Sequence, residues 1–555
     1  MNTAPNNGTV SDIIADVIAE HSEVVFGLMG NGNAFLISSL TARGHRFISA
    51  RHEQGTVAMA DAYHRASGKI ATATATYGAG FTNTLTSLAE ARLARIPLVL
   101  VVGESPTTGM RPWDVDQTAI AGGLGVLTLT VQAHTAAALA RRAFEHAARE
   151  RVPVVVAIPY DLAALPAPAQ KNVESLPASP ATQTDPDDVA KAASILAQSS
   201  RPLIIAGRGA VVSEAGPTLR EAGDRLGALF ATSVMARNIF GSDWDLGIAG
   251  GFGRMAAVEI MRQADVVLVV GAGLNMFQMR YGTLISPDAT VIQVDTLPAA
   301  THDRVDLFIR SDSKVFGELL LDELEMRTTG WRSRVPEVAD GRLAEEPPSE
   351  ELAPDGRLNP KAFAQALETI LPVERTIVQD GGHFSGWIPM YCSAPDPQAL
   401  MLVGTAFQTI GLGLPAAVGA AQAGNGRTTV LVTGDGGALM ALAELETMIR
   451  AVNSGIIVVF NDAAYGAELH QYAARGLHSQ AMLIDEVDFA AVGRAFGAEA
   501  LKARSLSDLD QLKDWVARGC PGVFVLDLPV SQTVIAEYMS ESMQGILAPV
   551  APPTI

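Results

Sequence analysis

The sequence predicts an α/β protein made of three doubly wound, parallel-sheet domains in series. Short β-branched, apolar runs alternate with longer stretches of helical spacing along the chain. Most of these runs are bounded by Gly or Pro, which indicates strands that are buried on both faces and therefore parallel sheets covered by helices. The 51 glycines among 555 residues fit the many tight turns that such sheets need between strand and helix.

The expected strands follow one another in three blocks. The first block contains KIATATAT, PLVLVVG and PVVVAIP, the second contains PLIIAG, DVVLVVGAG and TVIQVD, and the third contains TIVQD, TTVLVTGDGG, GIIVVFND and GVFVLDL. A chain of 555 residues is too long for a single hydrophobic core, which agrees with several domains.

Two stretches have the composition of extended, solvated linkers. Residues 162–188 are rich in Pro, Ala and polar residues, and residues 339–357 are acidic and rich in Pro. They divide the chain into blocks of ordinary domain size. The expected division is a first domain over 1–165, a central domain over 186–338, a third domain over 358–535 and a C-terminal tail over 536–555.

The composition excludes several classes of protein. A hydrophobic fraction of 48% with 18% charged residues is typical of a well-packed enzyme and not of a disordered chain. The net charge of −19 argues against nucleic acid and anionic membranes as partners. Cys392 and Cys520 are too few for a disulfide framework and suit a reducing cytoplasm. No secretory signal or membrane-length apolar run is found, so we expect a cytoplasmic enzyme.

One strand–helix–strand unit, GDGGALMALAELETMIRAVNSGIIVVFND over residues 434–462, has a carboxylate at each end. Its apolar stripe predicts a helix from Ala438 to about Val452. A right-handed crossover then brings Asp435 and Asp462 to the same edge of the sheet, at the carboxyl ends of neighbouring strands. Open α/β sheets bind ligands at that edge, and two carboxylates beside a glycine-rich helix start suit a divalent cation with a phosphate.

The same unit resembles the thiamin diphosphate motif, which begins with GDG and ends with NN after a similar spacing. The resemblance implies that Asp435 and Asp462 are side-chain ligands of Mg²⁺ and that the Ala464 carbonyl is a backbone ligand. It also implies a backbone cradle for the diphosphate, formed by Gly434, Gly436, Gly437 and Ala438. The usual second Asn is Asp462 here, and this extra anion attracts the metal but repels the diphosphate. An ordinary βαβ unit with a glycine-rich turn is the alternative interpretation.

The first block carries a second motif of this family. The stretch RHEQGTVAMADAYHRASGK, residues 51–69, resembles the segment of the catalytic glutamate, and Glu53 follows the expected strand RFIS and begins the expected helix. In the family this glutamate hydrogen-bonds N1′ of the aminopyrimidine, which leads the 4′-nitrogen to deprotonate the thiazolium C2. Taken alone, an acidic residue at a helix start is often only a cap or a partner of the helix dipole.

Further segments follow in the order of the family. TYGAGFTNTLTSLAEARLARIPLVLVVGE, residues 76–104, resembles the GPG-x-TN segment, with Ala79 where proline is usual. Gln117, in WDVDQTA, resembles the glutamine of the FQE turn in acetolactate synthases and is a candidate substrate contact. Asp116 replaces the usual Phe of that turn.

Two segments of the third block complete the resemblance. QDGGHFSGW, residues 379–387, resembles the segment that reaches the diphosphate. It contributes Gly382, His383 and Phe384, and the last two fit packing roles equally well. GTAFQTIGLGLPAAVGAA, residues 404–421, resembles the segment that bends the cofactor. In it, Ile410 lies under the two rings or is simply a core isoleucine, and the backbone of Gln408 accepts from the 4′-amino group.

The resemblance covers nearly the whole chain, and the nearest patterns are those of acetolactate synthase and benzoylformate decarboxylase. It implies thiamin diphosphate and Mg²⁺ as cofactors, addition to a small-molecule 2-oxo acid, loss of CO₂ and carboligation to a carbonyl acceptor. It also implies a homodimer or homotetramer with active sites between subunits. The alternatives in this class are simple decarboxylation to an aldehyde and C–C cleavage without decarboxylation.

Two further hypotheses lie outside this class of enzyme. A non-catalytic, cofactor-binding relative is disfavoured because Glu53 and Asp435 are retained. A serine hydrolase is disfavoured because no GxSxG nucleophile elbow occurs.

Several polar residues beyond the metal end of the sheet are candidates for substrate chemistry. Tyr465, Glu468 and His470 either relay protons or cap a solvated helix, and we prefer the solvated cap for His470 and His478. Arg280 either pairs with a carboxylate or is a surface arginine.

The central block raises the question of a nucleotide. GGFGRMA, residues 250–256, matches a loose GxGxxA pattern but follows what we expect to be a polar loop, GSDWDLGIA, and not a clear strand. This is a weak dinucleotide signal, so FAD is not favoured as a cofactor.

Overall fold

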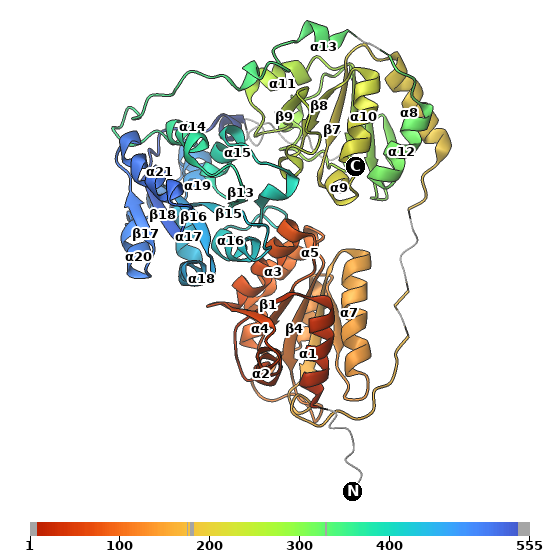
Figure 1. The fold of residues 1–555 in the computed structure, drawn as a ribbon, viewed down its shortest axis with the longest axis vertical. Coiled ribbons are helices and arrows are strands. Elements are labelled where there is room, and N and C mark those ends of the chain that lie inside the picture. The colour runs from red at the N-terminus through yellow and green to blue at the C-terminus, as the bar shows by residue number, and fades with distance from the viewer. Residues whose placement is uncertain (1–7, 175, 178–181, 328–329, 542–555) are drawn as a thin grey trace.

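The computed structural model describes residues 8–174, 176–177, 182–327 and 330–541, and it contains three six-stranded sheets in series along the chain (Figure 1). The strand pairs within these sheets are parallel. The predicted α/β class with three parallel-sheet domains is therefore confirmed. Within the described ranges, no helix combines the length and the apolar character that crossing a membrane requires.

The first sheet has the strand order β2-β1-β3-β4-β6-β5. Its strands are β1 (Val24–Gly27), β2 (Arg46–Ser49), β3 (Thr72–Ala75), β4 (Leu98–Glu104), β5 (Leu127–Thr130) and β6 (Pro153–Pro159). The helices around it are α1 (Val10–His21), α2 (Ala34–Ala42), α3 (Glu53–Ser67), α4 (Ala79–Asn83), α5 (Leu85–Leu93), α6 (Gln117–Gly123) and α7 (Ala136–Glu150).

The central sheet has the order β12-β11-β10-β7-β8-β9. Its strands are β7 (Pro202–Ala206), β8 (Leu229–Thr232), β9 (Asp245–Ile248), β10 (Val266–Val270), β11 (Thr290–Asp295) and β12 (Leu307–Arg310). Its helices are α8 (Pro186–Gln198), α9 (Arg208–Val212), α10 (Gly216–Leu226), α11 (Met255–Met261), α12 (Ser313–Glu323) and α13 (Trp331–Arg334).

The third sheet has the order β14-β13-β15-β16-β18-β17. Its strands are β13 (Arg375–Gln379), β14 (Leu400–Leu402), β15 (Thr428–Gly434), β16 (Ser454–Asn461), β17 (Glu499–Lys502) and β18 (Gly522–Pro529). Its helices are α14 (Pro360–Ile370), α15 (Trp387–Tyr391), α16 (Gly413–Ala421), α17 (Asp435–Met440), α18 (Ala443–Ala451), α19 (Gly466–Tyr472), α20 (Phe489–Ala495) and α21 (Asp510–Ala517), with short 3-10 helices that include η4 (His383–Gly386) and η7 (Ser479–Met482).

The apolar runs of the sequence form inner strands of the sheets. These strands are apolar throughout because helices cover both of their faces. Every residue of β6 and of β15 is buried. The runs PVVVAIP and TVIQVD coincide with β6 and β11. Continuous apolar runs therefore mark strands with a neighbour on each side and a helix layer on each face.

The sequence predicted a loop for the segment GSDWDLGIA, and this prediction is wrong. The segment contains β9, which pairs only with β8 at the edge of the central sheet and across a register shift. An edge strand has one strand neighbour and does not require a continuous apolar run, which explains why its polar sequence hid it.

The single helix expected from Ala438 to Val452 is also wrong in detail. The chain forms α17 and α18, and it leaves the helical conformation at Ala441 (φ −114°, ψ 21°). The first helix starts three residues earlier than expected because Gly434 is extended and the Asp435 carboxylate accepts from the N–H of Gly436.

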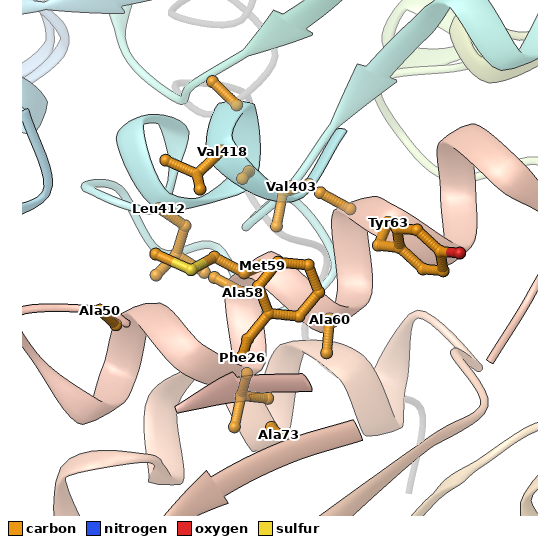
Figure 2. Close-up of a cluster of buried hydrophobic side chains, with 14 of the residues drawn as sticks. Phe26, Ala50, Ala58, Met59, Ala60, Tyr63, Ala73, Val403, Leu412 and Val418 are labelled. Carbon is orange, nitrogen blue, oxygen red and sulfur yellow. The ribbon is translucent and has the colours of Figure 1, made fainter. Parts of the chain in front are cut away.

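Helix α3 of the first domain packs directly against α16 of the third domain. Figure 2 shows Met59 of α3 among buried side chains that include Leu412 and Val418 from the third domain. The two backbones approach each other closely at Gly419, where a Cβ atom would lie 2.0 Å from the carbonyl oxygen of Met59. This contact holds α3, whose first residue is Glu53, against the third domain.

Replacing Gly419 by Ala should therefore lower the free energy of unfolding by about 1–3 kcal/mol, because the new methyl group overpacks a backbone contact. Alanine at a helix position otherwise favours folding, so the sign of the change is diagnostic. Urea denaturation measures it. The matched control is Gly122→Ala in α6, where a Cβ atom meets nothing within 4 Å. Equal stability of the two variants would contradict the packing argument.

Candidate active site

A cavity of about 670 Å³ opens at the carboxyl edge of the third sheet. The central domain contributes Phe252 and Phe277 to its wall, and the first domain contributes Arg65 from α3 and Glu90 from α5. A cavity of this size at this edge is the usual place for a ligand in an open parallel sheet.

The cavity brings most of the predicted site residues together. Strands β13, β15 and β16 are parallel neighbours, so the segments that follow them meet at one edge. The predicted residues that line the cavity are Gly382, His383, Phe384, Gln408, Ile410, Gly434, Asp435, Gly436, Gly437, Asp462, Ala464, Tyr465 and Glu468. Ala438 is buried in α17 and is not part of the lining, and neither are Glu53 and Gln117.

Asp435 and Asp462 form a buried acidic pair. Burial raises the pKa of Asp435 to about 6. Burial and, secondly, the charge of Asp435 raise the pKa of Asp462 to about 7. One oxygen of each accepts from a backbone N–H, of Gly436 at 2.9 Å and of Ala464 at 3.2 Å. Asp435 Oδ2 is buried without a hydrogen-bond partner in the described part of the chain.

This pair fits a hydrated divalent cation that also binds a diphosphate. Across the described ranges, no group of three or more His, Cys, Asp or Glu side chains is arranged to hold a metal. Mg²⁺ does not need such a group, because it binds through one or two carboxylates, water and phosphate oxygens. A cation also relieves the repulsion within the pair and uses the unpaired oxygen of Asp435.

His383 lies against the acidic pair. Its Nδ1 is 3.9 Å from Asp462 Oδ2, and its ring centroid is 4.5 Å from that of His470. Burial and the neighbouring His470 lower the pKa of His383 to about 3, so its ring is neutral near pH 7. His470 is itself buried, so a solvated cap is the wrong interpretation for it. His478 is exposed and accepts from the N–H of Gln480 at the start of η7, as a cap does.

Close contacts explain the glycines of the predicted cradle. A Cβ atom on Gly434 would lie 2.8 Å from the ring of Phe384, and one on Gly436 would lie 2.8 Å from the ring of Tyr465. The Phe384 ring also stacks on Phe460 with 5.9 Å between centroids. Any larger residue at these glycine positions would displace aromatic side chains that form the cavity wall.

Asp380 is a buried acid that the sequence analysis missed. It accepts from the N–H of Gly381 at 2.8 Å, from the N–H of Gly411 at 3.1 Å and from Thr433 Oγ1 at 3.2 Å. Burial raises its pKa to about 6. Asp380 thus ties the turn after β13 to the turn that carries Ile410. A polar residue directly after a buried strand and before glycines is the signal that identified Asp435, and it could have identified Asp380.

The loop that carries Gln408 and Ile410 is held from two sides. Gln408 has a left-handed backbone (φ +58°), and its side chain donates to the carbonyl of Thr405 at 2.7 Å. From the first domain, the Glu90 carboxylate accepts from the N–H of Phe407 at 2.7 Å. The backbone position of Gln408 is therefore fixed by a local turn and by a contact between domains.

Residues near the C-terminus complete the cavity. Tyr538 lines it, and its hydroxyl donates to the carbonyl of His383 and accepts from the N–H of Gly386. Arg280 is fully buried and pairs with Glu541, so the carboxylate interpretation is correct and the surface interpretation is wrong. From the expected tail over 536–555, Tyr538 and Met539 line the cavity, and residues 542–555 lie outside the described residues.

Glu53 and Gln117 lie on the first domain, away from this cavity. Glu53 is half-buried, and its carboxylate accepts from Asn83 Nδ2 at 3.0 Å. Gln117 is buried; its amide accepts from the N–H of Gly78 at 2.7 Å and donates to the carbonyl of Gly103 at 2.9 Å. The Gln117 side chain therefore holds a turn inside its own domain.

Comparison with known proteins identifies the family of this chain. Family models described as the N-terminal TPP binding domain, the central domain and the C-terminal TPP binding domain of thiamine pyrophosphate enzymes match residues 8–122, 189–323 and 380–528. The chain belongs to the thiamine pyrophosphate enzymes. In this thiamine pyrophosphate enzyme, Glu53 lies in the matched N-terminal domain, and Asp435 and Asp462 lie in the matched C-terminal domain.

Several curated relatives match nearly the whole chain at low identity. A probable acetolactate synthase large subunit of Methanocaldococcus jannaschii is 27% identical, over 93% of this chain and 91% of its own length. A probable 2-ketoarginine decarboxylase of Pseudomonas aeruginosa is 28% identical, over 91% of both chains. A sulfoacetaldehyde acetyltransferase of Castellaniella defragrans is 26% identical, over 91% of this chain and 89% of its own length.

The acidic pair predicts a pH-dependent effect of Asp462→Asn on the cofactor-free enzyme. Because the folded state raises the pKa of Asp462 from 3.8 to about 7, the contribution of this acid to stability is complete below pH 3.8 and is lost as the pH rises through 7. Asn cannot ionise, so the variant should gain on the order of 2 kcal/mol of unfolding free energy near pH 8 and none near pH 4.

Urea denaturation at the two pH values, without metal, measures the gain. The exposed Asp485→Asn is the matched control and should show no difference between them. A gain from Asp462→Asn that is the same at both pH values would contradict the electrostatic account.

Proposed function

We propose that this enzyme uses thiamin diphosphate and Mg²⁺ to decarboxylate a 2-oxo acid and to join the remaining acyl unit to a carbonyl acceptor. The buried pair Asp435 and Asp462 carries the proposal, because these two acids repel each other and leave one carboxylate oxygen without a partner at the ligand-binding edge. A divalent cation supplies the missing positive charge, and a diphosphate supplies further oxygen ligands to it.

The third domain holds the metal and the diphosphate. The carboxylates of Asp435 and Asp462 and the carbonyl of Ala464 bind Mg²⁺. Gly434, Gly436, Gly437 and Ala438 form the turn along the diphosphate, and Gly382, His383 and Phe384 approach it from β13. The neutral ring of His383 has a buried Nε2 without a partner in the described chain, and as an N–H donor it suits a phosphate oxygen.

When bound, thiamin diphosphate supplies the nucleophilic carbon for attack on the 2-oxo group and an electron sink for the pair that CO₂ leaves behind. The residues of this chain orient and shield that centre. Ile410 supports the two rings, and the carbonyl of Gln408 accepts from the amino group of the pyrimidine. Tyr465 and Glu468, at the open side of the cavity, hold or move protons of the substrate.

A second copy of the chain supplies Glu53 to the site. Glu53 does not line the cavity of its own chain, and its half-buried carboxylate lies in the first domain with Asn83 as its donor. This placement supports a homodimer or homotetramer with sites between subunits. Gln117 acts indirectly by holding the turn at Gly78, since this turn packs against Glu53, with a Cβ on Gly80 only 3.3 Å from the carboxylate.

The remaining assignments follow from the sequence and the relatives. Relatives named as acetolactate synthases and as a sulfoacetaldehyde acetyltransferase support transfer of an acyl unit. The net charge of −19 disfavours nucleic acid and membrane partners. Cys392 and Cys520 are buried free thiols, which suits a cytoplasmic location. FAD is not favoured, because the loose GxGxxA pattern is by itself a weak dinucleotide signal, although it lies between β9 and α11.

Simple decarboxylation to an aldehyde is the second candidate. The side chain of Glu468 is exposed and lines the cavity, so a carboxyl group is available to protonate the reacting carbon in place of a carbonyl acceptor. A relative named as a probable 2-ketoarginine decarboxylase gives this candidate further support.

The primary test is CO₂ release by purified protein with thiamin diphosphate and Mg²⁺, across pyruvate, branched 2-oxo acids and benzoylformate. Release is expected from at least one acid and should fall by about 10²–10⁴-fold in Glu53→Gln, which removes the carboxyl group but retains its shape. Chelation of Mg²⁺ should abolish release. The control is Glu145→Gln on the exposed face of α7. Unchanged release in Glu53→Gln would overturn the proposal.

Product analysis separates the two candidates. With an aldehyde or a second 2-oxo acid present, ligation yields an acyloin or an acetohydroxy acid, whereas simple decarboxylation yields free aldehyde. If Glu468 delivers the proton, Glu468→Gln should lower aldehyde release by about tenfold or more while CO₂ loss in the presence of an acceptor persists. A proportional loss of both products would assign Glu468 to a step that they share.

A further inference from the structure

Glu444, at the start of α18 in the third domain, lies in contact with the first domain beside Glu53. It is buried, with 2% of its surface exposed. Its Oε1 accepts from two successive backbone N–H groups, of Arg51 at 2.9 Å and of His52 at 2.8 Å. These residues immediately precede Glu53, the first residue of α3.

The contact is close and specific for a carboxylate or amide oxygen. A Cβ atom on Gly55, in the first turn of α3, would lie 2.7 Å from Glu444 Oε1. A glycine is therefore required there for the carboxylate to approach. The N–H groups of Arg51 and His52 find their acceptor in the third domain and not in their own. These two hydrogen bonds are partly buried, so the acceptor constrains the path of the chain into α3.

Nothing else about Glu444 requires an acid at this position. Its neighbour Glu446 is half-buried and pairs with the side chains of Arg51 and Arg450, which are themselves partly exposed. The Glu444 side chain instead points into the domain interface, and its Oε2 has no partner in the described residues.

We infer that Glu444 is a positioning residue for Glu53: its carboxylate fixes the backbone of Arg51 and His52 and so sets where the Glu53 carboxyl group projects. The inference rests on the proposed function, in which Glu53 serves the cofactor. Because α18 belongs to the same strand–helix–strand unit as Asp435 and Asp462, one unit then sets both the metal end of its own site and the carboxyl group offered to the site of the neighbouring copy.

The test uses the whole protein and Glu444→Met, which keeps the volume but removes the acceptor. The direct readout is amide hydrogen exchange of residues 51–52 in the cofactor-free protein, which should become faster. The functional readout is hydrogen–deuterium exchange at C2 of bound thiamin diphosphate without substrate. It should slow by about 10- to 100-fold, as expected for a misplaced catalytic group. Affinity for thiamin diphosphate with Mg²⁺, followed by tryptophan fluorescence, should stay within about threefold, since the metal ligands are untouched.

Two further variants define the cause. Glu444→Gln retains an oxygen acceptor and should restore most of the C2 exchange, which a merely space-filling role would not explain. Gly55→Ala retains the Glu444 carboxylate, but its new methyl group pushes that carboxylate away from the backbone of Arg51 and His52. This variant should slow C2 exchange as Glu444→Met does. It also carries the test if Glu444→Met does not fold. The matched control is Glu145→Gln on the exposed face of α7, which should change none of these readouts.

The outcomes separate the inference from the proposed function. Slow C2 exchange in Glu53→Gln with normal exchange in Glu444→Met and Gly55→Ala would overturn the inference alone. Normal C2 exchange in Glu53→Gln would overturn the role of Glu53 and, with it, the inference. In the Glu53→Gln background, Glu444→Met should have little additional effect, because both act through one carboxyl group. Fully multiplicative effects would show that Glu444 acts independently and would contradict the inference.

Discussion

The packing of α3 on α16 is the contact on which the placement of the functional groups depends. The backbones meet at Gly419 and Met59 with no room for a side chain, which constrains how the first and third domains dock. That docking turns the start of α3, and with it Glu53, away from the cavity of the same chain. This placement agrees with the proposal that Glu53 serves the cavity of a second copy of the chain.

The cavity itself depends on unfavourable electrostatics. Asp380, Asp435 and Asp462 are buried acids with raised pKa values, and the first causes of all three shifts are burial and not hydrogen bonding. Asp380 compensates by accepting from several donors of the surrounding turns. Asp435 and Asp462 repel each other, and Asp435 retains a buried oxygen without a partner in the described residues. This is costly in the protein alone and favourable once a cation is present. The site is thus arranged for a positively charged ligand, and this arrangement lowers the stability of the protein when the ligand is absent.

Much of this arrangement could be predicted from the sequence, for identifiable reasons. Continuous apolar runs mark strands that are buried on both faces, and the strand that lacked such a run, β9, was the edge strand that the analysis missed. Asp435 and Asp462 could be predicted because the crossover of a strand–helix–strand unit brings the carboxyl ends of its two strands to one edge of the sheet. The break at Ala441 was missed because an uninterrupted apolar stripe hides a local change of backbone conformation.

Contacts between elements far apart in sequence could not be predicted in this way. The pattern around Glu444 is that of any acid in the first turn of a helix, and only the docked domains show that it accepts from Arg51 and His52. In the same way, nothing local to His470 distinguishes a solvated cap from a ring buried against His383. Arg280 and Glu541, 261 residues apart, pair only because the end of the chain returns to the cavity.

The central claim is that each site joins the cavity of one chain to Glu53 of another. Mixing two inactive variants, Glu53→Gln and Asp435→Ala, by joint unfolding and refolding tests it most directly, with each variant refolded alone as the control. A mixed dimer would contain one site with both changes and one site with neither, so random pairing should restore about a quarter of the wild-type activity. If Glu53 acted in the cavity of its own chain, every site would carry one change, and a mixture that stays inactive would contradict the account.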